Sequence, residues 1–258
     1  FHFESGSFMD AEDETISPKN IGLSEGTKNY YKSIGKEPYF IYDFVSNFIN
    51  GFATVEIKGK GYNFINKQGE LLWKEDKWFD RVEYFFDGVT KVYIKSQGWN
   101  FINEQGKLVY KGDKWFDNAW YFYKGLARVY LKGQGWNFIN TKGELVWKED
   151  KWFDEVYNFQ WGFACVRIES QGWNFINSNG ELLWNKYKNF DVVDDFNDGF
   201  ACVQIEGRGF NFIKTNGELL WKEDKWFDNV GEFSNGFVIV ELGGTEYRLN
   251  TQGELIIN

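Results

Sequence analysis

Residues 88–124 read GVTKVYIKSQGWNFINEQGKLVYKGDKWFDNAWYFYK, and near copies of this stretch follow one another along the chain. The spacing between copies is 37 residues. A period in this range indicates one supersecondary structure repeated in tandem, which stacks on its neighbours to bury its apolar face. The full repeats predicted from this spacing are residues 51–87, 88–124, 125–161, 162–198 and 199–235.

Alternation of apolar and polar side chains within one repeat predicts antiparallel strands. Ala53, Val55 and Ile57 alternate with polar residues, which is the two-residue period of a strand with one buried face. Glycine-containing turns separate this stretch from further apolar stretches. No repeat has the helical spacing of apolar residues over ten positions. The sequence therefore predicts an all-β chain of tandem 37-residue antiparallel β-meanders. Further strands are expected at residues 62–66 and 70–73, and residues 82–85 are expected to form a fourth strand or an extended edge.

The two ends of the repeat region predict how the array closes. Residues 37–50 supply only the last part of a repeat and residues 236–258 only the first part, so that together they make a sixth. A closed ring needs this offset, because closure removes exposed sheet edges. The sequence thus favours a single repeat domain over residues 37–258, arranged as a closed six-bladed β-propeller-like ring. An open β-solenoid is the alternative.

Residues 1–36 lie outside the period. They are acidic at residues 10–14 and rich in turn-forming residues at 17–26, so we expect an acidic, poorly ordered lead-in. Residues 1–8 are compatible with a tag that precedes a native start at Met9.

Charge and composition exclude several classes of partner. The formal net charge is -9, from 29 basic and 38 acidic residues. Phosphate backbones and anionic lipids bind clustered basic residues, so nucleic acid and anionic membrane surfaces are excluded. No run of 18 apolar residues predicts a membrane span. Cys165 and Cys202 are too few for a disulfide framework and leave the compartment undetermined, with a secreted or cell-surface location slightly favoured.

The sequence offers no foundation for catalysis. The only histidine is His2, so the repeats contain neither a histidine triad nor a histidine metal cluster. The glycines lie at turns rather than in a phosphate-binding loop. Paired acidic residues are too few for a calcium motif. We therefore expect a non-enzymatic protein with no catalytic residue, metal or cofactor.

The motif GWNFINEQG at residues 98–106, followed by FDNAWYFYKGLARV at residues 116–129, resembles the bacterial WG-repeat family. The likeness covers about residues 38–258. The chain departs from the family at Asn100, where glycine usually follows the aromatic residue. The resemblance implies an all-β repeat array that binds partners, and it implies no catalytic residues.

Tryptophans are the leading candidate binding residues. Each repeat carries three large aromatic positions, more than a β array is expected to bury, and exposed tryptophan faces bind sugar rings and peptide side chains. The alternative is a tryptophan-rich core. The position before each Phe-Asp pair is preferred, because a lysine and an aspartate flank it. These candidate residues are Trp78, Trp115, Trp152 and Trp226, with Lys77, Lys114, Lys151 and Lys225.

Aspartates and asparagines that recur in every repeat are predicted to be structural. Such carboxylates accept backbone N–H bonds at turns, and buried amides must be hydrogen-bonded. The alternatives are a ring of carboxylates for cations and amides that recognise sugar hydroxyls. The residues are Asp80, Asp117, Asp154, Asp191 and Asp228, and Asn63, Asn100, Asn137, Asn174 and Asn211.

Binding specificity is expected where the repeats differ. The sequence favours a non-enzymatic repeat scaffold that binds a protein or peptide partner through partly exposed aromatics. A multivalent carbohydrate-binding lectin is the alternative, because weak repeated sites gain from avidity, and a glycan-cleaving enzyme is the third, less favoured. One position that differs is the fourth of each repeat, occupied by Thr54, Lys91, Arg128, Cys165, Cys202 and Ile239.

Overall fold

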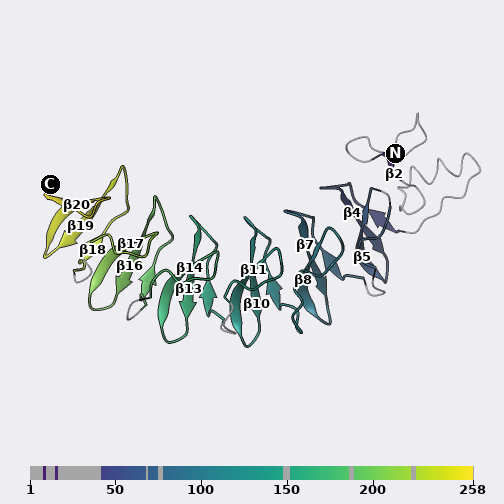
Figure 1. The fold of residues 1–258 in the computed structure, drawn as a ribbon, viewed down its shortest axis with the longest axis horizontal. Coiled ribbons are helices and arrows are strands. Elements are labelled where there is room, and N and C mark those ends of the chain that lie inside the picture. The colour runs from purple at the N-terminus through teal and green to yellow at the C-terminus, as the bar shows by residue number, and fades with distance from the viewer. Residues whose placement is uncertain are drawn as a thin grey trace, which may run out of the picture. The chain divides into compact units, whose positions relative to one another are not determined.

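The computed structural model describes residues 8–9, 15–16, 42–67, 69–74, 78–147, 152–185, 189–221 and 225–257. The chain divides into two compact parts, an N-terminal part of residues 1–132 with 139–144 and a C-terminal part of residues 133–138 with 145–258. Every regular element of the described residues is a β-strand (Figure 1), which confirms the all-β prediction. Whether residues 37–258 form a single repeat domain stays a prediction.

The predicted lead-in lies mostly outside the described residues. Within residues 1–36, the structure describes only β1 (Phe8–Met9) and β2 (Thr15–Ile16), which pair in antiparallel fashion.

Each repeat contributes a hairpin of two six-residue strands. In the second hairpin, Val92 lies opposite Asn100 and Ile94 opposite Gly98. The alternation seen in the sequence is the alternation of burial, since Ala53 and Val55 are buried and Thr54 between them is half-buried. The hairpin strands are β4 (Phe52–Ile57), β5 (Gly61–Asn66), β7 (Val89–Ile94), β8 (Gly98–Asn103), β10 (Leu126–Leu131), β11 (Gly135–Asn140), β13 (Phe163–Ile168), β14 (Gly172–Asn177), β16 (Phe200–Ile205), β17 (Gly209–Lys214), β19 (Phe237–Leu242) and β20 (Thr245–Asn250).

A two-residue strand from the end of one repeat completes the sheet of the next hairpin. Val82, for example, lies opposite Val92. Each sheet therefore combines two repeats, which joins neighbouring repeats through backbone hydrogen bonds. These short strands are β3 (Phe44–Val45), β6 (Arg81–Val82), β9 (Asn118–Ala119), β12 (Glu155–Val156), β15 (Val192–Val193) and β18 (Asn229–Val230).

The prediction of a continuous third strand at residues 70–73 is wrong. The edge of β5 pairs at one end with Leu71, through a bridge to Ile65, and at the other end with Phe79, through a bridge to Tyr62. The chain leaves the edge between these two bridges, so the third strand is interrupted. A continuous third strand forms only at the end of the chain, where β21 (Leu255–Ile257) pairs with β20.

The strand pairing that a closed ring was predicted to need is not among the pairings of the described residues. The sheet at the end of the chain has the order β18-β19-β20-β21 and draws only on residues 229–257. At the other end, β3 pairs with β4, with Phe44 opposite Glu56. This local pairing closes a short loop and so has a small entropic cost. The choice between a ring and an open β-solenoid stays a prediction.

Both faces of the first hairpin contribute side chains to buried apolar clusters. One face of the first hairpin forms a cluster in which Ala53 and Val55 pack with Trp78. The other face contributes Phe64 to a cluster that includes Val92 of the second hairpin. Since each sheet has two apolar faces, a single repeat cannot bury its own core.

Candidate functional site

The recurrent asparagines hold the chain where it leaves the sheet edge. Asn100 is completely buried. Its Nδ2 donates to the Tyr110 carbonyl at 3.0 Å, and its Oδ1 accepts the amide N–H groups of Tyr110 at 3.2 Å and Phe101 at 2.7 Å. These amides bind backbone and are not available to a ligand. The same pattern holds for Asn63, Asn137, Asn174 and Asn211.

The recurrent aspartates accept hydrogen bonds at the hairpin turns. Asp80 Oδ2 accepts the amide N–H of Lys95 at 2.6 Å, so the carboxylate joins the end of one repeat to the hairpin of the next. Asp154 is observed in a different bond, in which its backbone N–H donates to the Arg167 carbonyl at 3.0 Å. The corresponding carboxylate bonds join Asp43 to Lys58, Asp117 to Lys132, Asp191 to Glu206, and Asp228 to Gly243.

The preferred tryptophan position does not present a repeated set of exposed rings. Trp78 is 4% exposed and Trp226 is 8% exposed, so both belong to the core and cannot offer an open ring face to a ligand. Each ring packs on the hairpin of its own repeat, Trp78 in a cluster with Val55 and Trp226 in a cluster with Val203. Trp115 and Trp152 are half-buried. Of the flanking lysines, Lys114 and Lys225 are exposed, whereas Lys77 and Lys151 lie outside the described residues.

The large exposed aromatics of the N-terminal part instead lie on and after the short strands. We call Phe44, Tyr84, Phe86 and Tyr121 the aromatic ridge, and these side chains are between 49% and 61% exposed. Sequence reasoning placed residues 82–85 in a fourth strand or extended edge and did not name Phe44, Phe86 or Tyr121 as candidate binding residues. The signal that could have found them is that residues 84–86 and 121–123 carry aromatics at neighbouring positions, with no alternation that would bury them.

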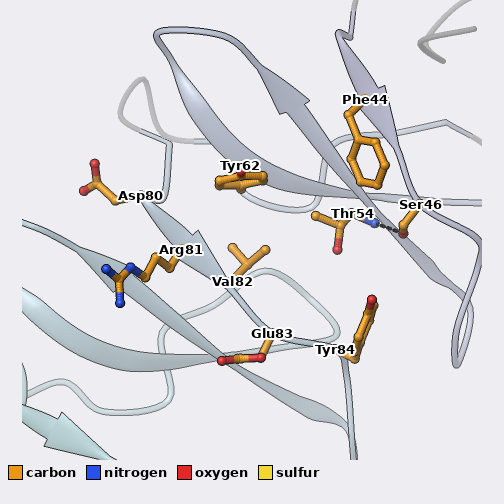
Figure 2. Close-up of a pocket in the computed structure, with 9 residues that line it drawn as sticks. All are labelled: Phe44, Ser46, Thr54, Tyr62, Asp80, Arg81, Val82, Glu83 and Tyr84. Atoms are coloured by element: carbon orange, nitrogen blue, oxygen red, sulfur yellow. Dashed lines mark hydrogen bonds between the residues drawn. The ribbon is translucent and has the colours of Figure 1, made fainter.

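A cavity of about 540 Å³ lies between the first and second sheets of the N-terminal part. Phe44, Thr54 and Tyr62 line it from the first sheet, and Val82 and Tyr84 line it from the second (Figure 2). We call this cavity the first groove. Ser46, Asp80, Arg81 and Glu83 complete its lining.

A smaller hollow of about 10 Å³ connects further members of the ridge. Tyr84, Phe86 and Tyr121 all line it. Since Tyr84 also lines the first groove, the ridge and the groove form one continuous surface.

Cys165 and Cys202 are both free thiols. Burial, followed by the charge of Asp195, raises the pKa of Cys165. Burial, followed by the charge of Asp194, raises the pKa of Cys202 to about 12. Both thiols therefore stay protonated near neutral pH, a state that suits neither a nucleophile nor a metal ligand.

No helix in the part of the chain that the structure describes is both apolar enough and long enough to cross a bilayer. No group of three or more histidine, cysteine, aspartate or glutamate side chains is arranged there to hold a metal ion.

Comparison with known proteins finds a repeat family that matches four segments of the chain. The family model described as "WG containing repeat" matches residues 39–60, 99–134, 173–208 and 227–245. No curated protein sequence matches the chain. Among solved structures, the computationally designed Ika8 protein is 12% identical over 82% of this chain and 84% of that one, with a TM-score of 0.31. BamB from Moraxella catarrhalis is 12% identical over 80% of this chain and 72% of that one, with a TM-score of 0.31. The WD40 beta propeller domain of Doa1 is 14% identical over 74% of this chain and 71% of that one, with a TM-score of 0.28. TM-scores this low support no conclusion about this chain.

Proposed function

The chain carries WG-containing repeats, and from this premise we propose that it is a non-enzymatic scaffold that binds a peptide segment of a partner protein along the aromatic ridge. The observation that carries the proposal is the continuity of the exposed ridge with the first groove, a cavity of about 540 Å³. This proposal does not depend on whether the repeats form the predicted ring or the open β-solenoid, because the ridge and the groove lie within the N-terminal part alone.

The chemistry of the ridge favours a protein partner. Contiguous exposed apolar surface is uncommon on soluble proteins and marks interaction sites. Tyrosine is enriched among the residues that dominate binding energy, because its ring buries a large area while its hydroxyl remains hydrogen-bonded. A groove beside such a ridge gives an extended peptide both a surface to lie on and a cavity for one side chain.

The sugar-binding alternatives have less support. A lectin with one site per repeat needs accessible tryptophan faces and free amides in each repeat. Trp78 and Trp226 are buried, and the recurrent asparagine amides bind backbone. The lectin and the glycan-cleaving enzyme stay predictions.

Selection of peptides against the protein tests the proposal. We expect peptides enriched on the wild type to lose at least tenfold in affinity for the double variant Tyr84→Ser, Tyr121→Ser, since truncation of two central aromatics removes more than ~1.4 kcal/mol of binding free energy. Fluorescence anisotropy measures the change in Kd.

The matched control is Tyr157→Ser, which removes a tyrosine of similar exposure from the C-terminal part. Its affinity for the same peptides should stay within about twofold of wild type. Equal affinities of the double variant and the wild type would contradict the proposal. Enrichment of glycans in place of peptides would favour the lectin.

A further inference from the structure

In the first two hairpins the fourth residue of the repeat lies on the sheet face that looks toward the next sheet. Thr54 holds this place in the first hairpin, where it lines the first groove. Lys91, 37 residues later, holds it in the second hairpin. The two residues can therefore be compared directly, since the same backbone carries a short side chain in one groove and a long cationic one in the next.

Lys91 places its ammonium in a site built from two aromatic rings and one carbonyl. Its Nζ donates to the Ala119 carbonyl at 3.2 Å. The same atom lies 4.3 Å from the centroid of the Trp99 ring and 4.5 Å from that of the Tyr121 ring. An ammonium within about 6 Å of a ring centroid is attracted by the negative face of the ring. The chain thus binds a cation of its own between the second and third sheets, in a space that we call the second groove.

The charge around Lys91 is consistent with this arrangement. Burial lowers the pKa of Lys91, and the nearby carboxylate of Glu83 acts in the opposite direction. In the third hairpin Arg128 holds the fourth position, and its guanidinium lies 4.8 Å from the ring centroid of Trp120, which corresponds to Glu83 and not to either ring of the Lys91 site.

The first groove has residues equivalent to those around the Lys91 ammonium, but it has no equivalent lysine. Tyr62 holds the place of Trp99, Val82 that of Ala119, and Tyr84 that of Tyr121, each 37 residues earlier. Figure 2 shows Tyr62, Val82 and Tyr84 around one hollow beside Thr54. Because Thr54 is short, the space that the Lys91 side chain takes up in the second groove is open in the first.

The acidic residues around the first groove favour a positive occupant. Asp80 and Glu83 line it, together with a single cation, Arg81. The Arg81 guanidinium lies 5.7 Å from the Tyr93 ring centroid, so it has an aromatic partner on its own sheet. Two carboxylates against one guanidinium give the lining a formal charge of -1, and Glu83 is shared with the Lys91 ammonium on its other side.

We propose that the first groove binds the ammonium of a lysine side chain from the partner, between Tyr62, Tyr84 and the Val82 carbonyl. This inference rests on the proposed peptide-binding function and names the side chain that enters the cavity. Lysine is favoured over arginine because a single carbonyl between two rings suits a compact point charge, whereas a guanidinium fork pairs best with a bidentate acceptor.

A small probe tests the inference without knowledge of the partner. The probe is Nα-acetyl-lysine N-methylamide, titrated into the full chain while the methyl signals of Thr54 and Val82 are followed by NMR. We expect saturable shifts with a Kd on the order of millimolar, as two exposed cation–π contacts would give. The norleucine analogue has the same stem without the ammonium and should bind at least tenfold more weakly. Equal binding of the two probes would overturn the inference.

Two reciprocal variants provide the structural control. Thr54→Lys should fill the first groove with the protein's own ammonium and weaken probe binding at least tenfold. The fold should tolerate this change, because Lys91 already occupies the equivalent position on the same kind of sheet. Lys91→Thr should open the second groove, so that the probe also shifts the Ala119 methyl signal and the stoichiometry rises from one to two. Retained binding in Thr54→Lys, or no second site in Lys91→Thr, would contradict the inference.

The inference and the proposed function can fail separately. Selected peptides that lack lysine should still bind the ridge in the Thr54→Lys variant. If those peptides bind while the lysine probe does not, the ridge is the binding surface and the groove is not an ammonium site. If the lysine probe binds as expected and no peptide is enriched, the ammonium site stands and the ridge proposal is wrong.

Discussion

Replacement of Gly106 by alanine is expected to lower the free energy of unfolding of the N-terminal part by about 3 kcal/mol. Gly106 has a φ of +69°, where an alanine is strained, and a Cβ added there would overlap the Leu72 carbonyl oxygen of the preceding repeat. Backbone cannot yield as a flexible side chain can, so the two repeats must separate. The same close approach of a turn glycine to backbone recurs between Gly143 and Val109. Urea denaturation followed by tryptophan fluorescence measures the change.

Gly125→Ala is the matched control, because it has the same backbone strain without the overlap. Its φ is +81°, and nothing lies within 4 Å of an added Cβ. We expect a loss of about 1 kcal/mol from strain alone. If the two variants lose the same stability, the close approach of Gly106 to Leu72 does not hold the repeats together.

Asn100→Ala is expected to lower the free energy of unfolding by about 2–4 kcal/mol. The substitution leaves the amide and carbonyl groups of Tyr110 and the amide of Phe101 without the partner that Asn100 supplies. Because Asn100 is completely buried, water cannot replace the amide at once. Hydrogen exchange should also show faster exchange of the Tyr110 amide, since the residues that follow Tyr110 lose their attachment to β8.

Asn118→Ala tests whether burial is the cause. Asn118 is exposed, and its Oδ1 accepts the neighbouring Ala119 amide at 2.9 Å. Solvent can take over that bond, so the expected loss is about 0.5 kcal/mol or less. A similar loss in both variants would mean that the buried amide has no special role in stability.

The sequence predicted the class of fold because its strongest signals are local. Alternation in stretches such as residues 53–57 and glycines at fixed turn positions specify hairpins without reference to distant residues. The antiparallel hairpins, the tandem repeat and the WG-repeat resemblance are confirmed for these reasons.

The interrupted third strand could not be predicted in the same way. Residues 70–73 have the composition of a strand, but the Asn63 side chain holds the Trp73 backbone, with its Nδ2 2.8 Å from the Trp73 carbonyl. A side chain that replaces a strand neighbour leaves no periodic signal. The short strands could not be predicted from alternation either, since two residues such as Arg81–Val82 are too few to show it.

The exposure of the candidate aromatics could not be predicted from the sequence, because it depends on how the sheets pack. Trp78 and Tyr84 are both large aromatics in one repeat, yet Trp78 is buried in the first core cluster and Tyr84 is exposed. Only the packing of sheets decides between them. The variable fourth position was informative, however, because Thr54 and Lys91 determine whether a groove is open or filled.

Hydrogen–deuterium exchange of the full chain, with and without a selected peptide, tests most directly the claim that the aromatic ridge is the binding surface. If the peptide binds the aromatic ridge, we expect slower exchange in residues 44–46, 81–86 and 118–123. Exchange in the hairpin turns and in the C-terminal part should not change. Protection confined to the hairpin turns at residues 58–60, 95–97 and 132–134, or to the C-terminal part, would contradict the claim.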